Sequence, residues 1–268
     1  MVKTKLIGGL GNQMFQYAAG RSLAAQHGIP LACDVRAFED YPLHNGFELA
    51  KVFTGDFPTT QLGSEHRVVE PHFHYWSGFW GCPRDCCLEG YWQSEKYFRS
   101  ISGLLRDNFT FRHSPEGQNE LIASLIAKFE SVSIHIRRGD YVSNPETHAF
   151  HGVLPLAYYE TAVQFMLDHL ANPVFFVFSD DPEWALKNLK LQQETHVVTG
   201  NTGAHSYKDM QLMSECQHHI IANSSFSWWG AWLNRNPSKV VVAPRQWFAT
   251  DQLNTVDLIP QAWHRVPF

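Results

Sequence analysis

Short apolar segments alternate with amphipathic segments along most of the chain, and this alternation predicts the fold. Residues 3–7 have the pattern of a buried strand, residues 12–27 carry apolar side chains at helical spacing, and residues 29–35 resume as a strand. The run Gly8-Gly9-Leu10-Gly11 separates the first strand from the helix. A strand, a glycine loop, a helix and a second strand are typical of the opening of an α/β fold.

The alternation is most regular after residue 117, where apolar strands and helices follow one another. Such a series indicates a parallel sheet that is covered by helices on both faces. Residues 36–117 are rich in proline, glycine and aromatic side chains and are less regular. We therefore predict two α/β halves, 1–117 and 118–268, with a cleft between them. The expected elements of the second half are 118–129 (helix), 132–136 (strand), 155–171 (helix), 174–178 (strand), 182–190 (helix), 196–198 (strand), 209–216 (helix), 219–222 (strand), 226–234 (helix) and 239–243 (strand).

Composition and charge narrow the class of protein. The formal net charge of −5 argues against a nucleic-acid binder that relies on a global positive field. No segment reaches the roughly 18 consecutive apolar residues of a membrane span, and the N-terminal apolar stretch is too short and too glycine-broken for a signal peptide. Five cysteines, an odd number, suit a reducing compartment. We expect a cytoplasmic protein, and a peripheral position at the inner membrane face is compatible with these features.

The glycine loop is the first candidate for ligand binding. In Gly9-Leu10-Gly11-Asn12-Gln13-Met14, glycines that follow a strand allow the backbone to approach a diphosphate. Met14 stands where a dinucleotide fingerprint needs a third glycine, which disfavours a nicotinamide cofactor. A tight structural turn explains the loop equally well when the loop is considered alone.

The second candidate is the segment 133–141, which reads Ser-Ile-His-Ile-Arg-Arg-Gly-Asp-Tyr. Strand alternation sends His135 and Arg137 to one face, and the strand ends at the pair Arg137 and Arg138. Ligands of open α/β sheets bind beyond the carboxyl ends of strands, and arginine is suited to bidentate contact with phosphate. The alternative is a structural ion pair between an arginine and Asp140.

Two further strand ends carry polar residues. Ser179-Asp180-Asp181 either contacts a ligand or caps the helix that begins with Pro182. Asn223-Ser224-Ser225-Phe226 leads from a strand into a helix, which is a second geometry that can hold an anion. The tryptophans that follow, Trp228, Trp229 and Trp232, are expected to pack in the core.

We predict no metal site. The chain has no Asp-x-Asp motif of the kind that metal-dependent sugar transferases show. Zinc could use the histidines and cysteines between residues 72 and 87, but their spacing forms no pair of regular knuckles. Buried thiols and surface histidines explain the segment more simply. The residues concerned are His72, His74, Cys82, Cys86 and Cys87.

Four motifs together resemble the α-1,2-fucosyltransferases of glycosyltransferase family 11. They are Gly-Gly-Leu-Gly-Asn-Gln-Met-Phe-Gln-Tyr-Ala, His-Ile-Arg-Arg-Gly-Asp-Tyr, Phe-Ser-Asp-Asp and Asn-Ser-Ser-Phe-Ser-Trp-Trp-Gly-Ala-Trp-Leu, which occur in the family's order between residue 5 and about residue 245. The resemblance implies a GT-B fold and inverting, metal-independent transfer of fucose from GDP-β-L-fucose to the 2-hydroxyl of a galactose in a glycan. Animal members carry an N-terminal membrane anchor, so we expect a bacterial enzyme of surface polysaccharide synthesis.

The resemblance also implies roles for particular residues. Arg137 would contact the donor β-phosphate with His135 as its partner, and no cofactor beyond the donor substrate is expected. The proton of the acceptor hydroxyl could pass to Asp140, His135 or Asp34, and the sequence leaves these open. The alternatives to a fucosyltransferase are a non-catalytic glycan-binding protein and a nicotinamide-dependent oxidoreductase. The remaining expected donor contacts are Gly11 and Asn12 beside the diphosphate, Asp180 at the guanine or ribose, and Ser224, Ser225 and Phe226 at the phosphates and nucleoside.

Overall fold

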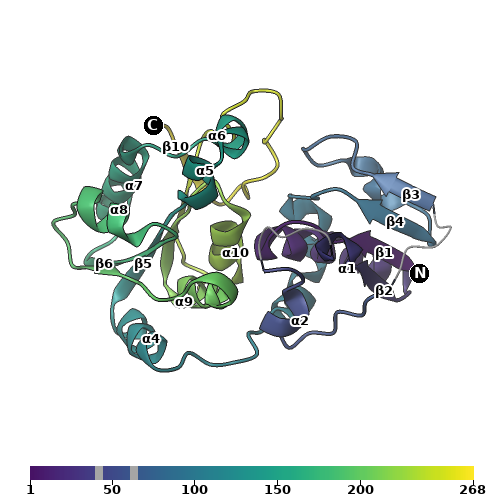
Figure 1. Cartoon of the computed structure of the whole chain (residues 1–268), viewed down its shortest axis with the longest axis horizontal. Coiled ribbons are helices and arrows are strands. Elements are labelled where there is room, and N and C mark those ends of the chain that lie inside the picture. The colour runs from purple at the N-terminus through teal and green to yellow at the C-terminus, as the bar shows by residue number, and fades with distance from the viewer. Residues whose placement is uncertain (40–44, 61–65) are drawn as a thin grey trace. The chain divides into compact units, whose positions relative to one another are not determined.

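The computed structural model describes residues 1–39, 45–60 and 66–268, which form two compact units (Figure 1). The first unit comprises Met1–His113 with Leu253–Pro260, and the second comprises Ser114–Gln252 with Gln261–Phe268. Each unit contains one parallel sheet, so the predicted α/β class is confirmed. Among the helices of the described ranges, none is long and apolar enough to cross a membrane.

The first unit has a sheet with the strand order β2-β1-β4-β3. The strands β3 and β4 were not predicted, because four-residue strands within a proline- and glycine-rich stretch are too short to show a clear period. The elements of this unit are β1 (Val2–Lys5), α1 (Leu10–His27), β2 (Leu31–Asp34), η1 (Arg36–Phe38), α2 (Leu49–Val52), β3 (His66–Val69), η2 (Ser77–Gly81), β4 (Cys86–Glu89), η3 (Glu95–Tyr97), η4 (Arg99–Ile101) and α3 (Ser102–Asn108).

The second unit has a sheet with the strand order β10-β9-β8-β5-β6-β7, and all its pairs are parallel. The predicted strands and helices of this half are found, with ends shifted by a few residues. Its elements are α4 (Gln118–Lys128), β5 (Glu130–Ile136), α5 (Gly139–Ser143), α6 (Pro145–His151), α7 (Leu156–His169), β6 (Pro173–Ser179), α8 (Pro182–Asn188), β7 (Thr195–Val197), η5 (Gly203–His205), α9 (Tyr207–Glu215), β8 (His218–Ile220), α10 (Ser225–Leu233), β9 (Val241–Pro244) and β10 (His264–Val266).

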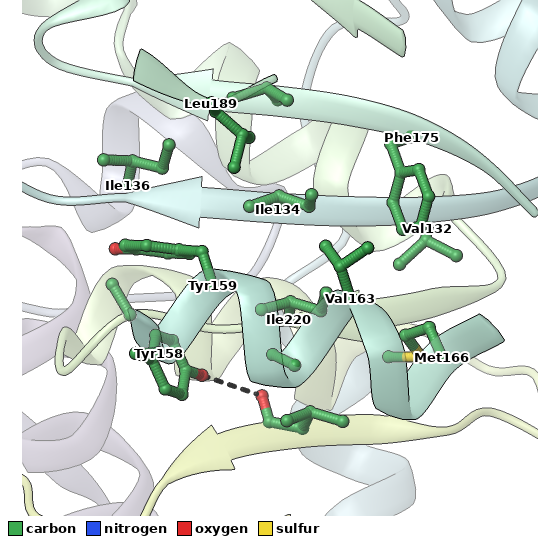
Figure 2. Close-up of a cluster of buried hydrophobic side chains, with 14 of the residues drawn as sticks. Val132, Ile134, Ile136, Tyr158, Tyr159, Val163, Met166, Phe175, Leu189 and Ile220 are labelled. Atoms are coloured by element: carbon green, nitrogen blue, oxygen red, sulfur yellow. Dashed lines mark hydrogen bonds between the residues drawn. The ribbon is translucent and has the colours of Figure 1, made fainter. Parts of the chain in front are cut away.

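A buried apolar cluster fixes the central strand of the second unit in place. The side chains of Val132 and Ile134 on β5 lie against α7, which contributes Tyr159 and Val163 (Figure 2). The hydroxyl of the buried Tyr158 donates a hydrogen bond of 2.6 Å to the carbonyl of Ile221. This packing holds the end of β5, where the arginine motif begins, on a rigid support.

Candidate active site

The strand order of the second unit reverses between β5 and β8. Strands β5, β6 and β7 extend the sheet toward one edge, and β8, β9 and β10 extend it toward the other. This is the strand order of a dinucleotide-binding sheet, in which ligands bind at the carboxyl ends of the strands beside the reversal. Arg137 follows β5 and Ser224 follows β8, so the topology places two predicted site residues at this position.

The guanidinium of Arg137 lies between two carboxylates. Its Nη1 is 2.8 Å from Oδ2 of Asp180, and its Nη2 contacts Oδ1 of Asp140. The side chain is 28 % exposed, and its guanidinium carbon lies 5.4 Å from the ring centre of Tyr141. The structure therefore brings together three of the predicted residues, and the positive charge remains within reach of a ligand from solvent.

Arg138 has a different environment. Its Nε donates to Oδ2 of Asp181 at 3.1 Å, and its guanidinium lies 4.1 Å from the ring centre of Trp184. Its backbone N–H donates to Oδ1 of Asp180 at 2.8 Å. Arg138 is thus anchored on α8 and helps to orient Asp180, whereas Arg137 is the arginine that faces the site.

Gly139 allows these contacts because it has no side chain. A Cβ at this position would lie 2.6 Å from Oδ2 of Asp180. Since Asp180 also binds Arg137, any side chain at residue 139 would displace the carboxylate that orients the guanidinium.

His135 is almost fully buried, with 5 % exposure, and its ring centre lies 5.7 Å from that of Phe226. Burial lowers the pKa of His135 to about 4, with opposing influences from Asp180, which raises it, and Arg137, which lowers it. The imidazole is therefore neutral near pH 7 and a weak proton acceptor.

The segment after β8 is organised by Asn223, whose side chain is buried. Its amide nitrogen lies within hydrogen-bond distance of the carbonyls of His151, Gly152 and Trp247, at 2.9, 3.3 and 3.1 Å. The backbone carbonyl of Asn223 accepts a hydrogen bond of 3.2 Å from the hydroxyl of Tyr141, whose ring stacks on His151 at 4.6 Å. Asn223 therefore links α6 and the segment after β9 to the aromatic side chain beneath Arg137.

Ser224 and Phe226 lie at the start of α10. The Ser224 hydroxyl accepts the backbone N–H of Phe226 at 3.3 Å and so caps the helix. The positive end of the α10 dipole therefore lies at the same edge as Arg137. Trp228, Trp229 and Trp232 are buried, which confirms their predicted place in the core.

In the first unit, the N-terminal end of α1 already has an anionic partner. The backbone N–H of Leu10 donates to the carboxyl group of Glu48, which is 4 % exposed. The backbone N–H groups of Asn12 and Gln13 bond to the carbonyl of Gly9 at 2.9 and 3.1 Å. A protein carboxylate thus lies where the sequence predicts a donor diphosphate, next to Gly11.

The side chain of Asn12 is oriented by Gln93, which the sequence did not single out. The Nε2 group of Gln93 donates to Oδ1 of Asn12 at 2.9 Å. Gly8 has a φ of +76°, and a Cβ there would lie 2.7 Å from Nδ2 of Asn12. The amide nitrogen of Asn12 therefore lies over the glycine loop.

Asp34, the third candidate proton acceptor, is held by Arg36. The guanidinium donates to both carboxylate oxygens, at 3.0 and 2.9 Å. Burial alone would raise the pKa of Asp34, but the hydrogen bonds and charge of Arg36 outweigh burial and hold it below its usual value.

The histidine and cysteine segment does not form a metal centre in the described part of the chain. Across residues 1–39, 45–60 and 66–268, no three histidine, cysteine, aspartate or glutamate side chains are grouped so that they could hold a metal ion. The five cysteines are buried free thiols, and the rings of His72 and His74 stack on each other at 3.6 Å.

Comparison with known proteins shows the family of the chain. The model of glycosyl transferase family 11 matches residues 1–265. An α-1,2-colitosyltransferase of Escherichia coli is 36 % identical over 99 % of both chains. The galactoside α-(1,2)-fucosyltransferase 2 of Sus scrofa is 28 % identical, over 85 % of this chain and 68 % of that protein.

The chain belongs to glycosyltransferase family 11. It is a glycosyltransferase, and the resemblance seen in its motifs is confirmed. This assignment decides against the nicotinamide-dependent oxidoreductase considered from the sequence.

Solved structures confirm the GT-B fold class that the resemblance implies. The NodZ α-1,6-fucosyltransferase co-crystallised with GDP has a TM-score of 0.52 at 15 % identity, over 86 % of this chain and 91 % of that one. Arabidopsis thaliana FUT1 has a TM-score of 0.51 at 12 % identity, over 90 % of this chain and 69 % of that one.

Several contacts around the predicted site residues of the two units were missed by the sequence reasoning. Asn223 stands in a recognised motif, but its contacts lie more than 20 residues away in the sequence. Glu48 and Gln93 lie within the irregular stretch 36–117, and no spacing pattern connects them to the glycine loop. Only Trp184, which follows the Asp180-Asp181 motif closely, could have been suggested as a neighbour of that motif.

Proposed function

We propose that this family 11 enzyme transfers L-fucose from GDP-β-L-fucose to the 2-hydroxyl of a galactose residue in a glycan. Transfer proceeds with inversion at the anomeric carbon and without a metal ion. The observation that carries the proposal is the accessible guanidinium of Arg137 at the reversal of a dinucleotide-type sheet. Several relatives are galactoside α-(1,2)-fucosyltransferases, and this supports the acceptor and the linkage.

The charges at this edge suit a GDP leaving group. As the bond to fucose breaks, negative charge grows on the diphosphate, and Arg137 with the N-terminal end of α10 stabilises it. The diphosphate competes with Asp140 and Asp180 for the same guanidinium, so donor binding exchanges carboxylate contacts for phosphate contacts. In this proposal Asp180 then turns to the ribose or guanine.

We assign proton acceptance from the acceptor hydroxyl to Asp140. His135 is a weak base because of burial, and Asp34 is bound on both oxygens by Arg36. The Asp140 side chain is 36 % exposed, and it forms an ion pair with Arg137, the residue that the donor would engage. Binding of the nucleotide to Arg137 would thereby free the Asp140 carboxylate to accept the proton of the acceptor hydroxyl.

A second donor is favoured by one specific observation. The Escherichia coli relative that matches nearly the whole chain is named an α-1,2-colitosyltransferase. Colitose is the 3-deoxy form of L-fucose, so both donors present the same diphosphate and differ at one sugar hydroxyl. The phosphate contacts proposed for Arg137 and the N-terminal end of α10 serve either donor.

The test is GDP release from GDP-L-fucose and from GDP-colitose, with and without lactose or type 1 or type 2 galactosides, in EDTA. Release that requires a galactoside and persists in EDTA supports metal-independent transfer, and the ratio of kcat/KM for the two donors identifies the sugar. GDP binding without release from either donor, together with glycan binding, would instead support a non-catalytic glycan-binding protein. Absence of GDP binding would refute the proposal.

A further inference from the structure

In the sheet of the first unit, β1 and β4 are parallel neighbours, so their carboxyl ends lie at the same edge. The chain runs from β1 outward to β2, then crosses to β3 and returns to β4 beside β1 (Figure 1). The segments that follow these two neighbouring strands meet through the hydrogen bond from Gln93 to Asn12. Ligands of open α/β sheets bind beyond the carboxyl ends of the strands, and the two amide side chains lie at that edge.

A strained turn places Gln93 there. Trp92 has a φ of +55° and is the only residue other than glycine with a positive φ among those that the structure describes. For a bulky, fully buried side chain this conformation is unfavourable by about 1–3 kcal/mol, so the surroundings must impose it. Backbone strain of this kind is concentrated at functional sites.

The carboxylate of Glu70, which follows β3, imposes the turn. One oxygen accepts the backbone N–H of Tyr91 at 2.7 Å, and the other accepts that of Trp92 at 3.0 Å. Gly90 makes room for this arrangement, because a Cβ there would lie 2.4 Å from the Cβ of Glu70. Gln16 fixes the other end of the turn by donating to the carbonyl of Gly90 at 3.1 Å.

The chemistry of this edge suits a neutral ligand with hydroxyl groups. Glu48 occupies the N-terminal end of α1 and accepts the backbone N–H of Leu10, so a phosphate there would have to displace a carboxyl group of the protein. Amide groups offer both donors and acceptors to hydroxyls, and the ring of Tyr91, a residue with 41 % exposure, offers an apolar face. A sugar has both kinds of surface.

We propose that Glu70 is a positioning residue for the acceptor: it holds the turn 90–93, and this turn sets Gln93 and Asn12 against the hydroxyls of a galactose-containing glycan. The inference rests on the proposed function, because it names the acceptor subsite of the same enzyme. It reassigns Asn12 from the donor diphosphate to the acceptor sugar.

The charge state of Glu70 provides a readout that a purely structural role would not give. Burial raises the pKa of Glu70 to about 7, against the lowering effect of the two backbone N–H groups and of His72. Glu70 in turn adds to the effect of burial in raising the pKa of the Tyr97 hydroxyl. Protonation weakens the carboxyl as an acceptor for two N–H groups, so the turn loosens as the pH falls below about 7.

The experiment compares wild type with Glu70→Gln, using N-acetyllactosamine as the probe and calorimetry in the presence of GDP, together with transfer kinetics. The glutamine keeps one acceptor oxygen and turns an NH2 group toward a backbone N–H. At about pH 8 the variant is expected to bind the glycan at least 10-fold more weakly, while GDP binding changes less than 2-fold. In wild type the glycan Kd and KM rise as the pH falls from about 8 to about 6, and in the variant they are flat.

Glu89→Gln is the matched control, because Glu89 ends the adjacent strand and pairs with the exposed Arg67. Its glycan binding should stay within 2-fold of wild type. If Glu70→Gln does not fold, Gln93→Met removes the amide at similar volume and should weaken glycan binding equally. Unchanged glycan binding in Glu70→Gln would overturn the inference, and so would unchanged binding in Gln93→Met if Glu70→Gln does not fold. Equal losses of GDP and glycan binding in the variant would also overturn it. A wild-type protein that binds no galactoside would do the same. Wild type that binds the glycan without transferring sugar would overturn only the proposed function.

Discussion

Asp209 provides a quantitative test of the described packing of the second unit. It lies in the first turn of α9, and its Oδ1 accepts a hydrogen bond of 2.7 Å from the side chain of Asn201, which is paired with Asn119 on α4. Burial raises the pKa of Asp209 from 3.8 to about 7, although the bond from Asn201 opposes the shift. The native protein therefore holds a proton at this carboxyl over a pH range in which the unfolded chain has lost it.

The sign and size of the effect on stability follow from this difference. The pKa of Asp209 is higher in the folded protein than in the unfolded chain. Its contribution to the stability of the folded protein is therefore fully present below about pH 3.8 and is lost as the pH rises through about 7. A shift of 7 − 3.8 = 3.2 units, at about 1.4 kcal/mol per unit, gives an upper bound of about 4 kcal/mol. Asp209 keeps some contact with solvent, so we expect about 2 kcal/mol.

Asp209→Asn removes the titration and keeps an oxygen for Asn201. Its advantage over wild type in the free energy of unfolding should grow by about 2 kcal/mol between about pH 4.5 and about pH 8. Urea unfolding followed by tryptophan fluorescence is the assay, since Trp228 and Trp229 lie buried in the same unit. Subtracting the free energy of unfolding of wild type from that of the variant removes the contribution of every other titrating group.

Asp168→Asn is the control for this measurement. Asp168 is an exposed residue on α7 that accepts a bond from Gln164 at 2.8 Å, and its replacement should leave the pH dependence of unfolding unchanged within about 0.5 kcal/mol. A difference between Asp209→Asn and wild type that is equal at both pH values would refute the reasoning, because the carboxyl would then be solvated in the folded protein.

Three further predictions concern the site. Arg137→Lys should lower kcat by about 10²-fold or more with an unchanged Tm, because one ammonium cannot reproduce the two-pronged contact; near-normal turnover would contradict its assigned role. Gly139→Ala should displace Asp180 and weaken GDP binding in calorimetry at least 10-fold, and unchanged affinity would show that Asp180 does not order the site. Asp140→Asn should abolish the acidic limb of the pH dependence of kcat while GDP still binds, and a profile identical to that of wild type would remove Asp140 as the proton acceptor.

The α/β class and the gathering of polar residues at the carboxyl edge of the second sheet could be predicted from the sequence. Helix and strand periods are local properties, and the carboxyl ends of neighbouring parallel strands lie at the same edge of a sheet. Polar residues that directly follow strands, such as Arg137, Asp180 and Ser224, are therefore brought together once the strand order is known.

Long-range contacts, by contrast, were decided only by the tertiary structure. The sequence singles out Arg137 of the arginine pair, but it does not show that Arg138 binds Asp181 and stacks on Trp184. Glu48 meets the N-terminal end of α1, and Glu70 imposes the turn before Gln93, across separations at which no periodic pattern operates. Such contacts depend on which surfaces the packed core brings within a few ångströms, and this is a property of the whole folded unit.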